Sequence, residues 1–100
     1  VRILNNVINK ANPVAYPSYY LTEDGYVTIV VYDIKGRSLL SLQENSLRKG
    51  GVNIKENGWR GVNAKGKKVG PGLYYIRISA KSALTGKVLI NEIKKVVVSQ

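Results

Sequence analysis

The stretch that decides the fold runs from Gly58 to Ile78 and reads GWRGVNAKGKKVGPGLYYIRI. It contains Trp59, the only tryptophan of the chain, and five of the ten glycines. A Gly-Pro-Gly turn at residues 70–72 leads directly into an aromatic and β-branched run, which is typical of a strand that follows a tight turn. Alternation in this run predicts a strand whose Tyr74, Ile76 and Ile78 face a core.

Outward from this stretch, the chain shows short strand patterns separated by turn residues and no helical periodicity. The strongest pattern is Tyr26 to Ile34, where Val27, Ile29 and Val31 define one face and Val30, Tyr32 and Ile34 the other. Because both faces are apolar, we expect a central strand covered on both sides. The predicted strands are 2–9 with an irregularity at its asparagines, 18–22, 26–34, 37–42, 52–59, 73–80 and 87–99.

These segments predict one all-β domain over residues 1–100. About seven short strands, with turn signals every eight to twelve residues, indicate an antiparallel β-sandwich of the immunoglobulin or fibronectin III type. An up-and-down barrel is the alternative. Residues 43–51 are predicted to be a loop, and a break in alternation near 92–95 predicts a bulge in the last strand, with Val88, Ile90, Val96 and Val98 facing the core.

The composition of the chain excludes several kinds of functional site. The chain has neither cysteine nor histidine, which excludes disulfides, thiolate ligands and a Ser-His-Asp triad. No motif predicts a catalytic residue, a metal site or a cofactor, so we expect a protein that is not an enzyme. No apolar run is long enough to span a bilayer, and no secretory signal pattern opens the chain. Since residue 1 is Val, we expect a fragment of a longer protein.

Basic residues outnumber acidic ones by 16 to 6, which gives a formal net charge of +10. Such a charge favours acidic partners, although a solvated basic surface is the simpler interpretation. No recognition helix, zinc motif or RNA-binding signature accompanies it, so nucleic acid is not expected.

Two turns share one chemistry, and both carry basic residues. Asp33 to Gly36 and Asn63 to Gly66 each place an Asx residue three positions before a glycine, as in type I turns. Because consecutive antiparallel strands reverse direction, both turns should lie at the same end of the sandwich. The sequence therefore predicts a basic, partner-binding end made of Lys35, Arg37, Arg60, Lys65, Lys67 and Lys68.

The aromatic residues suggest a second possibility, a carbohydrate-binding module. Tyr16, Tyr20 and Tyr75 are the best exposed candidates for stacking on sugar rings. Trp59 and Tyr74 are more simply interpreted as packing residues, with the Tyr74 hydroxyl bonded to backbone.

The order of these segments resembles a known family. The run from Val27 to Arg37, then Trp59-x-Gly61, Gly66, Gly72 to Ile78 and Lys95 to Val98 is similar to the immunoglobulin-like domain of the bacterial flagellar hook-capping protein (FlgD-like). The opening Asn5-Asn6-Val7-Ile8-Asn9 resembles the versions at the C-termini of exported spirochaete proteins. Two departures are Arg60, where the family usually has Asp, and Pro17, which predicts a late start for the strand that contains Tyr19.

The resemblance implies a structural or assembly module at the C-terminus of a larger exported protein, in the periplasm, at the cell surface or outside the cell. Its partner would be another protein or a domain of its own parent, with attachment, sorting or assembly as the role. A hook-cap component is a further alternative.

Overall fold

The computed structural model describes residues 1–99, and Gln100, which the predicted domain range includes, lies outside them. The described residues form an all-β fold without a helix, and so contain none that could cross a membrane. The strands are β1 (Arg2–Leu4), β2 (Val7–Ile8), β3 (Tyr16–Tyr20), β4 (Gly25–Tyr32), β5 (Ser38–Arg48), β6 (Asn53–Lys55), β7 (Gly72–Ser82) and β8 (Val88–Val98).

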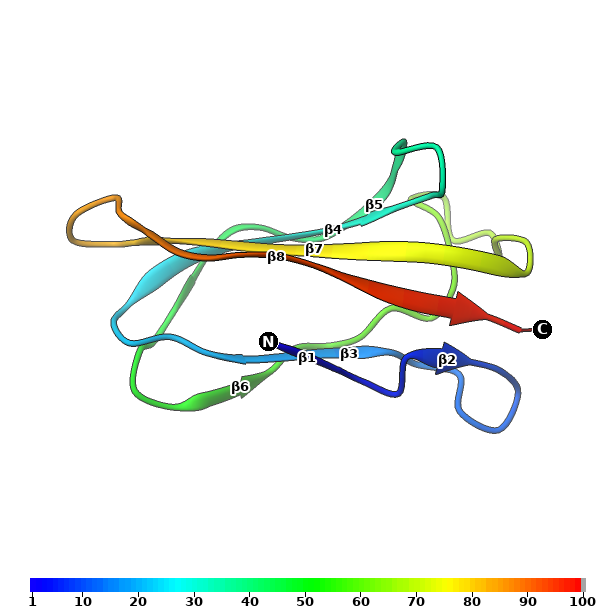
Figure 1. Cartoon of the computed structure of the whole chain (residues 1–100), viewed down its shortest axis with the longest axis horizontal. Helices are drawn as coiled ribbons and strands as arrows, with labels where there is room; N and C mark the ends of the chain where they lie inside the picture. The colour runs from blue at the N-terminus through cyan, green and yellow to red at the C-terminus, as the bar shows by residue number, and fades with distance from the viewer. Residues whose placement is uncertain (100) are drawn as a thin grey trace.

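The strands form two sheets that lie one above the other (Figure 1). The smaller sheet has the order β1-β3-β6 and the larger one the order β2-β8-β7-β4-β5. All neighbours pair antiparallel except β2 and β8, which are parallel. The all-β prediction is confirmed, and two separate sheets take the place of the single closed sheet that the barrel alternative required.

The core lies between the two sheets. The predicted inner face of β4 is confirmed, because Val27, Ile29 and Val31 are fully buried. In β7 the predicted alternation is also confirmed for Ile76 and Ile78. Further buried residues come from both layers: Ile8, Ala15, Tyr19, Leu21, Trp59, Ala80, Ile90, Val96 and Val98.

The outer face of β4 is less covered than the sequence predicts. Val30 and Tyr32 are only partly buried, and Ile34, beyond the end of the strand, is 70% exposed. The reason is the sheet order: β4 has a neighbour on each side within its sheet, but the small sheet covers its inner face alone. An apolar and aromatic surface therefore faces outward on the large sheet.

The segment predicted as a loop over residues 43–51 is strand as far as Arg48. β5 pairs with β4 along its whole length, with register shifts between Val27 and Ile29, between Ile29 and Val30, and between Val31 and Tyr32. β5 is an edge strand, and natural edge strands carry polar residues and bulges. Its Gln-Glu-Asn segment is polar for that reason, which is why the sequence pattern resembles a loop.

Pro17 does not delay the third strand, contrary to prediction. β3 begins at Tyr16, and Pro17 is buried within it opposite Ile3 of β1. A proline disrupts a ladder only where its missing N–H would donate. The Pro17 carbonyl accepts from the Glu56 amide at 2.9 Å, so the Pro17 nitrogen also faces Glu56. Because Glu56 lies one residue beyond the end of β6, the missing N–H of Pro17 removes no hydrogen bond between β3 and β6.

The last strand keeps one register over most of its length. β8 pairs with β7 without interruption from Val98 to Ile90, and the shift lies beyond that, between Ala80 and Lys81. The predicted bulge near 92–95 is therefore wrong. Val88 is 59% exposed, also against prediction, because a one-residue shift turns a side chain to the other face of a sheet.

The N-terminal segment crosses from one sheet to the other. β1 belongs to the small sheet and β2 to the large one, and Asn5 between them has φ 61°. The Asn5 side-chain amide donates to the carbonyls of Asn12 and Val14 at 2.9 and 2.8 Å. The predicted irregularity at the asparagines is confirmed, and it directs the chain between the two layers.

Trp59 fixes the stretch that connects β6 to β7. Its backbone exchanges two hydrogen bonds with Ala15, at 2.9 and 2.8 Å, and its indole N–H donates to the Val62 carbonyl at 2.7 Å. The indole lies edge to face with Tyr74, with ring centroids 5.3 Å apart. Trp59 is fully buried and the Tyr74 hydroxyl donates to the Gly70 carbonyl, as the packing interpretation predicts.

Candidate functional site

The two basic turns have nearly the same geometry. In the first, Asp33 Oδ1 accepts from the amides of Lys35 and Arg37 at 2.9 and 3.0 Å; in the second, Asn63 Oδ1 accepts from those of Lys65 and Lys67 at 2.9 and 3.1 Å. Both turns are closed by a glycine in the left-handed region, with φ 81° at residue 36 and 79° at residue 66. Such turns are rigid, so they present their basic side chains from fixed positions.

The turns lie at the same end of the molecule (Figure 1). A backbone hydrogen bond of 3.0 Å from Ala64 to Leu39 ties the second turn to the start of β5. The first turn borders Pro71 and Gly72 across a shallow hollow. Arg60 faces Pro13 and Asn12 across another hollow. Three loops therefore lie at this end, residues 9–15, 33–37 and 60–71, and the last of them borders each of the other two.

These loops carry far more positive than negative charge. Of the six predicted site residues, all lie here and all are exposed. Lys10, which the sequence analysis did not include, lies in the neighbouring 9–15 loop. We name this group the basic end; its members are Lys10, Lys35, Arg37, Arg60, Lys65, Lys67 and Lys68.

The carboxylate in the three loops is Asp33, set against seven basic side chains. It accepts from Arg37 Nε at 2.9 Å. Hydrogen bonds from the Arg37 backbone, and then from its guanidinium, lower the pKa of Asp33. Asp33 therefore stays charged but neutralises only Arg37, and the basic end keeps a strong excess of positive charge.

The opposite end of the sandwich contains a buried charged cluster. Glu56, which is buried, accepts from Arg48 through both carboxylate oxygens, at 2.8 and 3.0 Å, and also from the Tyr19 hydroxyl. Burial raises the pKa of Glu56, but the hydrogen bonds from Arg48 and Tyr19 outweigh it and the net pKa is lowered. For Tyr19, burial and the bond to Glu56 raise the pKa.

This cluster joins the two sheets. Arg48 ends β5 in the large sheet, whereas Tyr19 lies in β3 of the small one and Glu56 directly follows β6. Among the described residues, no buried side-chain nitrogen or oxygen lacks a hydrogen-bond partner, and those of this cluster are included. The acids of the nearby turn are also engaged: Ser82 Oγ donates to Glu23, and the Gly50 amide donates to Asp24 Oδ1.

The three tyrosines predicted for sugar stacking do not lie together. Tyr16 and Tyr20 lie on the outer face of the small sheet, where Lys55 is 4.2 Å from the Tyr16 ring centroid. Tyr75 lies on the outer face of the large sheet, opposite Tyr32 in register. The structure therefore separates the predicted aromatic platform into two faces.

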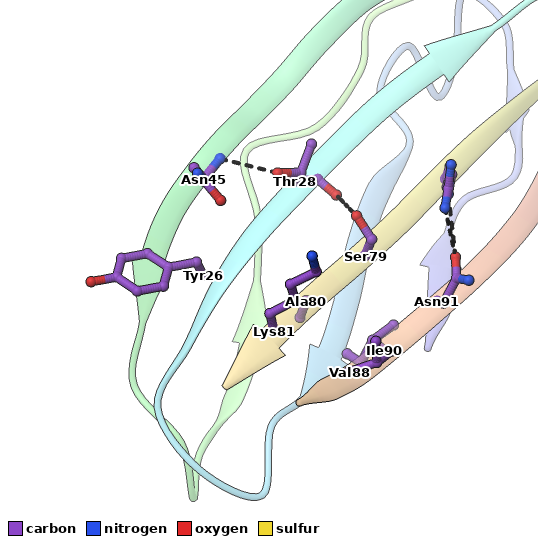
Figure 2. Close-up of a pocket in the computed structure, with 10 residues that line it drawn as sticks. Tyr26, Thr28, Asn45, Ser79, Ala80, Lys81, Val88, Ile90 and Asn91 are labelled. Carbon is purple, nitrogen blue, oxygen red and sulfur yellow. Dashed lines mark hydrogen bonds between the residues drawn. The ribbon is translucent and has the colours of Figure 1, made fainter. Parts of the chain in front are cut away.

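A groove on the outer face of the large sheet is a feature that the sequence analysis missed. It is lined by residues from β4, β5, β7 and β8, among them Thr28, Asn45, Arg77 and Asn91 (Figure 2). Within residues 1–99, no three acidic side chains come together in a way that could hold a metal ion. No local signal identifies such a groove, because strand pairing alone brings its residues together.

Comparison of the chain with models of known protein families, with curated proteins and with solved structures finds no match.

Proposed function

We propose that this chain is a non-enzymatic immunoglobulin-like module of a larger exported bacterial protein, and that its basic end docks on an acidic surface of another protein or of its parent. Attachment or assembly would follow from this contact. The observation that carries the proposal is the excess of seven basic side chains over a single, already paired carboxylate in three adjoining loops.

The immunoglobulin-like part of the proposal is supported by the strand order. Taking β1, β3 and β6 as strands A, B and E, and β8, β7, β4 and β5 as G, F, C and C′, the order follows that of immunoglobulin-type sandwiches. The chain's crossing between sheets at Asn5 separates β1 from β2, which then pairs with the last strand. The exported bacterial origin is supported by the family resemblance of the sequence.

Electrostatics supports docking at the basic end. Individual exposed ion pairs contribute little affinity, but several fixed charges of one sign steer a partner of opposite charge toward the surface. The backbone hydrogen bonds of the two Asx turns hold Lys35, Arg37, Lys65 and Lys67 on rigid supports. Association with an acidic partner is therefore expected to be fast and to weaken as salt rises.

A pull-down from a bacterial envelope extract tests this function. The wild-type chain is compared with a basic-end variant (Lys65→Glu, Lys67→Glu, Lys68→Glu) and a control variant (Arg2→Glu, Lys49→Glu, Lys87→Glu). All six positions are exposed. Each variant replaces three basic residues with glutamate, so the two variants change the net charge by the same amount. We expect an acidic protein that the wild type and the control retain, and that the basic-end variant loses by about tenfold.

Raised salt should reduce capture by the wild type as well, because exposed charges are screened. Equal losses in the two variants would show that net charge alone attracts the protein, and would contradict docking at the basic end. The same conclusion would follow if the wild type retained no acidic protein at low salt.

A further inference from the structure

The outer face of the large sheet carries two hollows that share one residue. The first has a volume of about 320 Å³ and the second about 400 Å³, and Arg77 of β7 lines both. Apolar and aromatic residues dominate the second, including Tyr32, Tyr75 and Ile93. The two hollows are therefore adjacent parts of one groove, whose second part reaches Asp33, Ile34 and Gly36 of the first basic turn.

A row of polar side chains crosses the groove (Figure 2). Asn45, Thr28, Ser79 and Asn91 come from four neighbouring strands, and pairing places Thr28 opposite Ser79 and Ser79 opposite Asn91. The backbone N–H of Asn45 donates to the Thr28 hydroxyl oxygen at 3.1 Å, which leaves the hydroxyl proton of Thr28 free to donate, whereas the Ser79 hydroxyl donates to the Thr28 carbonyl. The row thus presents hydroxyl and amide groups, which both donate and accept.

Arg77 provides a positive charge in the centre of the groove. Its Nε and Nη2 donate to Asn91 Oδ1 at 3.2 and 3.1 Å, so the amide holds the guanidinium in one orientation. The remaining N–H groups of the guanidinium can bind a carboxylate. Lys81 adds a second positive charge to the first hollow, which no carboxylate lines; Asp33 lines the second hollow and is paired with Arg37.

Tyrosines lie on both sides of this polar row, along the strand direction. Tyr26, which is 44% exposed, lies on one side, and Tyr32 with Tyr75 lies on the other. Tyr26 and Tyr32 lie six residues apart on β4, a separation of about 20 Å along a strand. Aromatic rings on both sides of a row of hydrogen-bonding groups suit an extended ligand with flat faces and many hydroxyls.

A peptide strand fits this groove less well. Backbone groups of β4 and β7 are already paired with a neighbour on each side, so the face offers only side chains as hydrogen-bonding partners. A peptide would bring its own N–H and C=O groups and leave them without backbone partners, whereas strand addition needs a free edge. Sugar hydroxyls match side-chain amides and hydroxyls directly.

We propose that this groove binds an anionic oligosaccharide, with the carboxylate of a uronic-acid unit on Arg77 and neighbouring sugar hydroxyls on the row formed by Asn45, Thr28, Ser79 and Asn91. The tyrosines contact the sugar rings on either side. The groove borders the basic end at the first basic turn but uses none of its basic side chains, and the proposal does not rest on the protein docking proposed above.

Calorimetric titration with defined polymers tests the site. The probes are polygalacturonate and hyaluronate as acidic sugars, dextran as a neutral sugar, and polyglutamate as an acidic chain without sugar. We expect the wild type to bind at least one acidic sugar, and to bind it more tightly than dextran or polyglutamate. Arg77→Met should weaken that binding by about tenfold, because it removes a charge-assisted hydrogen bond.

Three further variants make the test specific. Arg2→Met removes an exposed arginine from the small sheet and should leave binding unchanged. The basic-end variant should also keep its affinity for the acidic sugar, once the weaker general attraction caused by its lower net charge is subtracted. Tyr26→Ala should weaken binding several-fold without lowering the unfolding temperature, which shows that a folded protein has lost affinity.

Four results would overturn the proposal. They are no binding of either acidic sugar at millimolar concentration, equal binding of polyglutamate, equal binding of dextran, or the same loss of affinity with Arg2→Met as with Arg77→Met.

Discussion

Replacing Trp59 with alanine is expected to lower the free energy of unfolding by about 3 to 5 kcal/mol, the range for large aromatic residues in cores. The indole is fully buried, contacts Tyr74 edge to face and donates to the Val62 carbonyl. Alanine would leave a cavity and an unpaired carbonyl at the point where the connection to β7 is fixed. Since small domains are stable by about 5 to 15 kcal/mol, this is a large fraction of the total.

Urea unfolding followed by far-UV circular dichroism measures this effect, because the variant has no tryptophan to report by fluorescence. Trp59→Phe separates the two contributions: it retains a ring beside Tyr74 but loses the indole donor, so we expect an intermediate loss of stability. Tyr20→Ala is the control, since Tyr20 is 51% exposed and should change stability by less than about 0.5 kcal/mol. A loss below about 1 kcal/mol for Trp59→Ala would show that Trp59 does not hold the connection.

Replacing Arg48 with methionine is expected to cost about 3 kcal/mol, at the low end of the range for breaking a buried ion pair. The low end applies because the Arg48 side chain is 27% exposed, whereas that of Glu56 is only 4% exposed. Methionine keeps most of the packing of the arginine stem but leaves the Glu56 carboxylate without its cation. The variant should therefore unfold at a lower urea concentration, and the two sheets should separate first near β6.

A triple variant shows whether the loss of stability in Arg48→Met comes from the unpaired charge or from lost packing. Tyr19→Phe, Arg48→Met and Glu56→Leu together remove every polar group of the cluster, and apolar replacement of a whole buried network is often close to neutral. We expect the triple variant to be more stable than Arg48→Met alone. If it is as unstable as Arg48→Met, the cost lies in lost packing and the electrostatic explanation is wrong.

The cluster also predicts how acid affects stability. Because the folded pKa of Glu56 is lowered, its contribution is fully present above the carboxyl's unfolded value of about 4.3 and is lost as pH falls through the folded value. The urea midpoint of the wild type should therefore fall more between pH 7 and pH 3 than that of the triple variant. Equal falls would mean that Glu56 does not carry the effect.

Local chemistry was enough to predict much of this fold. The Asx-to-Gly turns at Asp33 and Asn63 need only residues within five positions of each other, and their hydrogen bonds form as the spacing predicts. Alternation in β4 and β7 identified the inner faces, because a buried strand face must be apolar. The grouping of the basic turns at one end followed from strand reversal alone.

The features that sequence missed depend on which strand lies beside which. β5 is polar because it is an edge, and only its pairing with β4 shows that residues 43–48 are strand. The groove around Arg77 combines side chains from four strands and requires the register between them. Glu56 lies on the inward side of its segment, but nothing near it in sequence indicates Tyr19 as a partner, 37 residues away.

The crossing of the chain at Asn5 has a mechanical consequence. It places β2 parallel to β8, so that Asn6 and Ile8 accept hydrogen bonds from Val97 and Ser99 at 2.9 and 2.8 Å. Tension applied to the two ends of the chain would pull these strands in opposite directions along their length. Hydrogen bonds loaded in shear break together and not one after another, so β2 and β8 resist the force as one unit. Val97→Pro removes one of them and should lower the rupture force in a pulling experiment; an unchanged force would place the mechanical resistance elsewhere.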